Sequence, residues 1–305
     1  MQSRVDQTMR DIRIRRIVTS RDVCGEGVLW HPHQEVVFWT DINRGLLHRC
    51  ALQNEPLETW RFDEPVTAVT LTTDEDLLLL VLGGRIVLWS LRLEKTVSTL
   101  FTLPEWPEVR CNDARVDPNG TLWFGTMENN VRSDGSTSPI ARSIGQLYSL
   151  AAGTEAQVWC TEMGIANTIA WSPNLETMYF GDTLQNCLYR CRFDAQRSII
   201  ENRTVFQQGF ARGLPDGSAV DAEGYLWNCR YGGACILRIA PDGTVVQVID
   251  TPVNNPTTCA FGGAEMKTLI FTSAGEHRAA EDGNEGSLFC LDVNTSGLPS
   301  TPFHL

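Results

Sequence analysis

A sixfold internal repeat constrains the fold of this 305-residue chain more than any other feature. Each copy has an alternating strand, a turn with Pro, Asp, Asn or Gly, and a second strand rich in Leu and aromatic residues. The copies are EGVLWHPHQEVVFWTD (26–41), TAVTLTTDEDLLLLVL (67–82), NDARVDPNGTLWFGTM (112–127), NTIAWSPNLETMYFGDT (167–183), DGSAVDAEGYLWNCRY (216–231) and TTCAFGGAEMKTLIFTSA (257–274). Recurrence at a regular period indicates a repeat architecture.

A second marker follows each copy and gives the same count of six. It is a short strand: GLLHRC (45–50), RIVLWSL (85–91), GQLYSL (145–150), NCLYRC (186–191), ACILRI (234–239) and GSLFCL (286–291). With further strands such as VQVID (246–250), each unit has about four strands at a period near 50 residues, which is typical of propeller blades. We therefore predict an all-β, six-bladed propeller with four-stranded antiparallel blades.

The N-terminal part of the chain is predicted to close the ring of blades. The N-terminal segment IRIRRIVTS precedes the first copy. It is expected to pair with the blade that contains GSLFCLDV, which closes the ring and removes an exposed strand edge. The whole chain, 1–305, is predicted to be a single domain in which about residues 1–12 form a flexible extension.

Composition narrows the possible partners. The formal net charge is −12 and there is no long Lys/Arg block, so nucleic acid is not an expected partner. No apolar run is long enough to span a bilayer, and the N-terminus lacks the apolar core of a secretion signal, so we expect a cytoplasmic protein without a membrane partner. The ten cysteines are scattered without a CxxC pair, which favours reduced packing residues. No obligate protein partner is indicated.

Polar residues begin every copy of the repeat. In a propeller the first strand of each blade lines the central channel, so these residues should lie at one height near the axis. They are Glu26, Thr67, Asn112, Asn167, Asp216 and Thr257. Unpaired buried charge is strongly disfavoured, so the two carboxylates and two amides predict an oxygen-rich site for one divalent cation. The alternative is that these side chains only cap strand ends.

A second group of residues should surround the same mouth. Antiparallel pairing returns the end of each second strand to the face where the first strand begins. The candidates for substrate contact are Glu128, Asp182, Arg230, Tyr231 and His277. Arg110, two residues before Asn112, is expected to hold a hydroxyl or a developing carboxylate. Each of these side chains could instead be a solvated or turn-capping residue.

Several segments resemble the senescence marker protein, regucalcin and gluconolactonase family: GEGVLWHP, RCNDARVDPNGTLWFGTM, NTIAWSPNLETMYFGDT and LPDGSAVDAEGYLW. The resemblance extends from about residue 20 to residue 291. It implies a six-bladed propeller that binds a divalent metal, and an activity as a sugar lactonase that converts aldonolactones to aldonic acids.

The resemblance also implies roles for individual residues. The family's metal-binding glutamate, asparagine and aspartate match Glu26, Asn167 and Asp216. The asparagine beside the metal matches Asn112, and the arginine before it matches Arg110.

The chain departs from the family pattern at two places. Thr168 follows Asn167 where the family usually has glycine, and the segment after GTM reads ENN, which begins at Glu128. Because of the second departure, the resemblance does not predict which residues of the ENN segment contact the substrate.

The expected function is hydrolysis of a sugar lactone by a gluconolactonase-like hydrolase of carboxylic esters. One divalent ion (Ca²⁺, Zn²⁺, Mg²⁺, Mn²⁺ or Fe²⁺) would polarise the carbonyl. Asp216 is the candidate catalytic base, and Arg110, Asn112 and Glu128 are the candidate substrate-binding residues. The alternatives are an arylesterase- or phosphotriesterase-like hydrolase on the same frame, or a non-catalytic calcium-binding propeller, since a fold alone does not define an activity.

Overall fold

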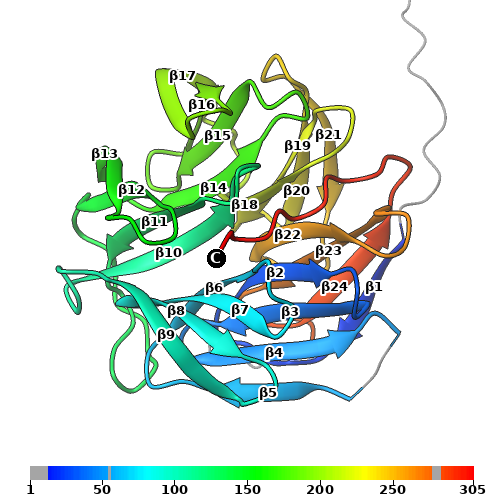
Figure 1. The fold of residues 1–305 in the computed structure, drawn as a ribbon. Coiled ribbons are helices and arrows are strands. Elements are labelled where there is room, and N and C mark those ends of the chain that lie inside the picture. The colour runs from blue at the N-terminus through cyan, green and yellow to red at the C-terminus, as the bar shows by residue number, and fades with distance from the viewer. Residues whose placement is uncertain (1–12, 54–55, 277–282) are drawn as a thin grey trace, which may run out of the picture.

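The computed structural model describes residues 13–53, 56–276 and 283–305, in which every regular element is a β-strand (Figure 1). The strands form six four-stranded antiparallel sheets. The expected extension at residues 1–12 lies outside the described residues. The prediction of an all-β, six-bladed propeller is confirmed.

In five of the sheets strand order follows chain order from the axis outward, and in the sixth the outermost strand is β1 (Ile14–Val18). The innermost strands are β2 (Gly25–His31), β6 (Val66–Leu71), β10 (Val109–Val116), β14 (Ala166–Trp171), β18 (Leu214–Val220) and β22 (Pro256–Gly262). The second strands are β3 (Val36–Asp41), β7 (Leu77–Leu82), β11 (Leu122–Glu128), β15 (Thr177–Asp182), β19 (Leu226–Tyr231) and β23 (Thr268–Ser273). The repeat copies are therefore the inner hairpins of blades 1 to 6.

The outer half of each blade completes the sheet. The third strands are β4 (Leu46–Ala51), β8 (Arg85–Ser90), β12 (Gly145–Leu150), β16 (Cys187–Asp194), β20 (Cys235–Ile239) and β24 (Leu288–Asp292). The outermost are β5 (Glu58–Arg61), β9 (Lys95–Thr102), β13 (Gln157–Met163), β17 (Ile199–Gln208), β21 (Val245–Asp250) and β1 (Ile14–Val18). β1 pairs antiparallel with β24, which confirms the predicted closure of the ring by the N-terminal strand.

Turn chemistry explains why the inner hairpins form. In blade 3, Asp117 accepts hydrogen bonds from the backbone amides of Asn119 (2.8 Å) and Thr121 (3.0 Å) and from Trp123 Nε1 (3.0 Å). In blade 5, Asp221 has the same pattern and accepts from Trp227 Nε1 at 2.9 Å. An aspartate that caps its own turn and binds the tryptophan of the next strand fixes the hairpin register.

The core lies between the blades. Six clusters of buried apolar side chains are present, and each draws its members mainly from two neighbouring blades. Neighbouring innermost strands also contact one another around the whole ring, including β22 with β2. Burial of apolar surface therefore stabilises the blades against each other and holds the inner strands at a fixed distance from the axis.

The C-terminal segment crosses the end of the channel that is remote from the repeat starts (Figure 1). It bridges to blade 5 through Gly297 and Asp221, and to blade 2 through Phe303 and Thr72. Together with residues of β2, β6, β10 and β22, the part of this segment at 300–301 lines a small cavity of about 20 Å³. The channel is thus covered at this end, and access is expected from the other.

Phe303 anchors this segment and provides a test of its importance. Its side chain is fully buried in the cluster between blades 2 and 3. Phe303→Ala is expected to lower the free energy of unfolding by about 3–5 kcal/mol, because a large cavity replaces the ring. Denaturant unfolding measures this change. Leu305→Ala is the control, since Leu305 is 51% exposed, and equal midpoints for both variants would show that the segment is not part of the folded core.

The structure also describes the cysteines and the possible membrane-spanning elements. All ten cysteines are free thiols. Among the described residues, no helix has the length and apolar character required to cross a bilayer.

Candidate active site on the propeller axis

All six innermost strands have a β-bulge or irregularity near their start. The register with the second strand shifts between Glu26 and Leu29, Val66 and Ala68, Cys111 and Ala114, Asn167 and Ala170, Pro215 and Ser218, and Pro256 and Cys259. A bulge leaves residues unpaired and redirects their side chains. The irregularities lie at the residues that the repeat alignment places on the axis, so the local backbone breaks the sheet pairing where the site is expected.

Two of the proposed cation ligands are in direct contact. Asp216 is 6% exposed, and its Oδ1 accepts hydrogen bonds from Asn167 Nδ2 at 2.5 Å and from the Gly217 amide at 3.1 Å. Asn167 Nδ2 also donates to Thr183 Oγ1 at 3.3 Å. Ligation of a cation through Asn167 Oδ1 requires this amide to make a half-turn, which exchanges its oxygen and nitrogen.

Glu26 lies close enough to these residues to interact with them electrostatically. Its Oε2 accepts a hydrogen bond from the Gly27 amide at 3.0 Å. Burial raises the pKa of Glu26 well above its usual value, and the negative charges of Asp216 and Asp113 raise it further. Burial likewise raises the pKa of Asp216 to about 8, with Asp113 adding to the shift. Both carboxylates are therefore costly to ionise in the absence of a compensating charge.

Asp113 is a further carboxylate near Glu26 and Asp216, and it was not among the residues predicted from the sequence. It is 9% exposed and accepts a hydrogen bond from the Ile169 amide at 3.3 Å. Burial raises its pKa as well. Strict alternation along the strand would direct Asp113 away from the face of Asn112, but both residues lie within the bulge. A bulge adds a residue that a period-two pattern does not reveal.

Arg110 is the cation whose charge acts on Glu26 and Asp216, and its side chain is 4% exposed. Its Nη1 donates to Asn112 Oδ1 at 2.8 Å and to the Cys111 carbonyl at 2.9 Å, while its Nε and Nη2 donate to Asn130 Oδ1 at 3.1 and 2.9 Å. Asn112 Nδ2 in turn donates to the Ala166 carbonyl at 3.1 Å. Arg110 thus holds Asn112 and the following loop through neutral acceptors.

The charges of this cluster suit a divalent cation. Glu26, Asp113 and Asp216 carry three negative charges when ionised, against two positive charges, that of Arg110 acting on Glu26 and Asp216 and that of Arg115 acting on Asp113. The described residues contain no group of three or more His, Cys, Asp or Glu side chains with the arrangement of a metal site. The donor set available at the mouth is two carboxylates and an amide, which matches hard, oxygen-preferring ions with open positions for water or substrate.

Glu128 lies at the end of β11, where its carboxylate binds the following loop. It accepts hydrogen bonds from the backbone amides of Ala141 (2.6 Å) and Arg142 (2.9 Å) and from Arg142 Nε (2.7 Å). Arg142 also donates to Glu108 at 2.5 Å. Its predicted role in substrate binding stays a prediction, and the contacts seen here join Glu128 to the loop.

That loop, residues 129–144, is a long connection between a second and a third strand, whereas blade 2 makes the same connection with residues 83–84. Its middle part is held by blade 1, where Asn43 Nδ2 donates to the Gly135 carbonyl at 2.8 Å and to Thr137 Oγ1 at 3.0 Å. The loop therefore extends from blade 3 to blade 1, and the repeat pattern gave no sign of this.

The remaining rim candidates have internal partners. Asp182 accepts hydrogen bonds from backbone amides of the 164–165 segment and of Leu184. Arg230 is fully buried and donates to Asn186 Oδ1 at 2.7 Å and to backbone carbonyls. The Tyr231 hydroxyl donates to Glu276. His277 lies outside the described residues.

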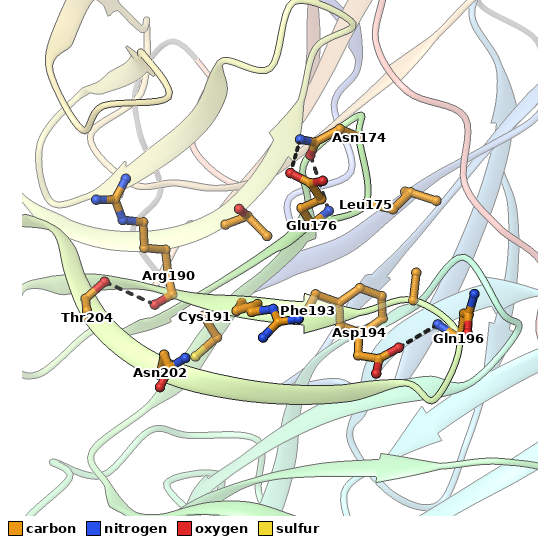
Figure 2. Close-up of a pocket in the computed structure, with 13 residues that line it drawn as sticks. Asn174, Leu175, Glu176, Arg190, Cys191, Phe193, Asp194, Gln196, Asn202 and Thr204 are labelled. Carbon is orange, nitrogen blue, oxygen red and sulfur yellow. Dashed lines mark hydrogen bonds between the residues drawn. The ribbon is translucent and has the colours of Figure 1, made fainter.

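A depression of about 870 Å³ on blade 4 is distinct from the axial cluster (Figure 2). It is lined by the 174–177 turn and by residues of β16 and β17, which are the outer strands of that blade. Figure 2 shows Asn174 Nδ2 donating to the Glu176 carboxylate and the Thr204 hydroxyl donating to the backbone carbonyl of Arg190, so the polar side chains of Asn174, Glu176 and Thr204 have local partners. None of the residues aligned on the axis lines it.

Comparison with known proteins agrees with this architecture. Residues 24–275 match the family model described as the SMP-30/gluconolactonase/LRE-like region. A 6-deoxy-6-sulfogluconolactonase of Pseudomonas putida is 31% identical over 294 residues, covering 94% of this chain and 97% of the relative. An L-arabinolactonase of Azospirillum brasilense is 30% identical over 292 residues, covering 94% of each chain.

A solved structure of the calcium-binding protein regucalcin from Agrobacterium tumefaciens has a TM-score of 0.87 and 26% identity, covering 96% of this chain and 98% of that one. The fold and the axial cluster define a six-bladed propeller with an acidic site at its centre. The chain belongs to the SMP-30/gluconolactonase/LRE-like family, as the sequence motifs predicted. Its named relatives include lactonases, which are carboxylic ester hydrolases, and this confirms the expected enzyme class.

Proposed function

We propose that this protein hydrolyses a sugar lactone to the corresponding aldonic acid at the axial cluster, with a divalent cation held by Glu26, Asn167 and Asp216. The observation that carries the proposal is that two carboxylates, Glu26 and Asp216, share the channel with one cation, Arg110, so that their negative charge exceeds the positive charge beside them. Support comes from the lactonase relatives, which match 94% of the chain. We also propose that the substrate is a small molecule and that the protein is cytoplasmic.

The reaction needs water and no other co-reactant. Water adds to the lactone carbonyl carbon, the bond from that carbon to the ring oxygen breaks, and the proton of the water passes to the ring oxygen. A bound cation supplies Lewis-acid polarisation of the carbonyl. Asp216 would accept a hydrogen bond from the attacking water, take its proton and pass that proton to the ring oxygen as the bond to the carbonyl carbon breaks. Arg110 and Asn112 bind the sugar hydroxyls, and burial of this pair keeps both side chains in one orientation.

The test is a panel of aldono-1,4- and 1,5-lactones, with acid release followed after correction for spontaneous hydrolysis. The protein is first treated with a chelator and then supplied with Ca²⁺, Mg²⁺, Mn²⁺, Zn²⁺ or Fe²⁺. We expect turnover of at least one lactone that disappears with the chelator and returns with a cation. Hydrolysis of aromatic esters or organophosphates alone would favour the alternative hydrolases. Cation binding without any turnover would favour a calcium-binding propeller.

Glu128 and Arg142 offer a separate test of how the 129–144 loop contributes. Glu128→Gln removes the charge but keeps the size of the side chain, and Arg142→Ala removes its ion-pair partner. Because both changes release the same loop, each is expected to raise KM by about threefold to tenfold with a smaller change in kcat. If only Glu128→Gln raises KM, Glu128 acts on the substrate directly and not through the loop.

A further inference from the structure

Thr168 combines two features that are rarely found together. It is fully buried, and its φ of 54° lies in the left-handed region, which a β-branched residue seldom adopts. The equivalent residue of blade 1 is Gly27, which follows Glu26 and has a φ of 58°. The backbone of this bulge therefore requires a positive φ, and glycine provides it without strain. A threonine at such a position indicates a role for its side chain.

The Thr168 hydroxyl donates a hydrogen bond to the backbone carbonyl of Asp216. That carbonyl lies in the bulge between Pro215 and Ser218, where the pairing with β19 is interrupted. Asn228 Nδ2 donates to the same carbonyl at 2.9 Å, and Thr168 Oγ1 lies 2.9 Å from Ser218 Oγ. The fully buried side chains of Thr168, Ser218 and Asn228 therefore replace the missing sheet hydrogen bond.

This contact joins blade 4 to blade 5 beneath the axial cluster. The positive φ of Thr168 sets the path of the backbone next to Asn167. Its hydroxyl donates a hydrogen bond to the backbone carbonyl of Asp216. Asn167 Nδ2 is in turn 2.5 Å from Asp216 Oδ1. A second link, from Thr183 Oγ1 to the Pro215 carbonyl at 2.8 Å, ties the same segment to blade 4. Thr168 is thus the residue that follows one proposed ligand in the chain and hydrogen-bonds to the main chain of another.

We propose that Thr168 is a positioning residue of the axial site, whose hydroxyl fixes Asp216 against Asn167 at the separation needed to bind the cation. This inference rests on the proposed function, because it assigns a purpose to the two ligands. It goes further by locating the control of their geometry in a side chain that touches neither cation nor substrate. The strained backbone at Thr168 is maintained by the hydrogen bonds that its hydroxyl makes.

Three variants separate the hydroxyl from the backbone strain. Thr168→Gly removes both, Thr168→Val removes the hydroxyl but keeps the branched side chain, and Thr168→Ser keeps the hydroxyl. The readouts are the affinity of chelator-treated protein for Ca²⁺ and Mn²⁺ by titration calorimetry, kcat and KM for a hydrolysed lactone, and the midpoint of thermal unfolding. Calorimetry reports on the site independently of turnover.

We expect the Gly and Val variants to bind the cation about tenfold more weakly than the wild type. Their kcat should fall by about tenfold while KM changes by less than about twofold, because the lost contact acts on the reacting centre and not on substrate binding. The Ser variant should stay within about twofold of the wild type in both measurements. The Gly variant should melt no lower than the Val variant, since glycine accepts the positive φ.

Wild-type cation affinity and kcat in both the Gly and Val variants would overturn the inference. So would a loss in all three variants that simply follows their thermal midpoints, because that pattern describes a structural residue. A wild-type protein that neither binds a cation nor opens a lactone would overturn the proposed function itself, and that result is obtained before any variant is measured.

Discussion

Asp216→Asn is expected to lower lactone turnover by about 10²- to 10⁴-fold and to weaken cation binding, while leaving the protein folded. Asparagine has nearly the same shape and can still accept the hydrogen bonds that Asn167 and Gly217 donate. It cannot supply a negative charge to a cation or take a proton from water. The measurements are kcat and KM with saturating cation, and calorimetric titration of the chelator-treated protein.

The matched control is Asp113→Asn, which makes the same chemical change at another buried carboxylate of the same channel. Asp113 raises the pKa of Asp216, so the control also removes a neighbouring charge from the cluster. Turnover of this variant is expected to stay within about tenfold of the wild type. If Asp113→Asn and Asp216→Asn lose turnover equally, the effect reports the total charge of the channel, and the specific role assigned to Asp216 is wrong.

The cation-free protein is expected to become less stable as the pH rises from about 5 to about 8. Burial raises the pKa of Asp216 from 3.8 to about 8, and the pKa of Glu26 is raised in the same way. The folded state therefore binds protons more tightly than the unfolded state, so the unfavourable contribution begins above pH 3.8 and is complete above about pH 8. Its size is on the order of several kcal/mol.

Denaturant unfolding of chelator-treated protein at several pH values measures this effect. Asp216→Asn should flatten the pH dependence and be more stable than the wild type near pH 8, because it buries no charge. Addition of a binding cation should stabilise the wild type most at high pH, where the carboxylates are ionised. Equal stability of the cation-free wild type at pH 5 and pH 8 would contradict the electrostatic description of the site.

Much of the fold could be read from the sequence because the repeat is local. Each copy contains its own strand alternation and turn residues, as in the Asp117 and Asp221 turns, and these determine a hairpin without distant contacts. Counting the copies then gave the number of blades. The candidate axial residues were chosen from the same alignment, because equivalent positions in a ring share one distance from the axis.

The details of the site could not be obtained in this way. Asp113 was missed because a bulge turns two consecutive residues out of the regular pattern. Thr168 was noted only as a departure from the family, since its positive φ is a property of the folded backbone. The contacts of Glu128 were equally hidden, because they depend on the path of the 129–144 loop.

The sequence by itself therefore determined the number and type of blades, the closing strand and the start of each inner hairpin, because these depend on local periodicity and on the symmetry of the repeat. Only the tertiary structure decided which buried carboxylates interact, which side chain holds Asp216 in place and what covers the far end of the channel. Those features arise where residues distant in the chain meet, as Thr168 meets the Asp216 carbonyl and Phe303 enters the core between blades 2 and 3.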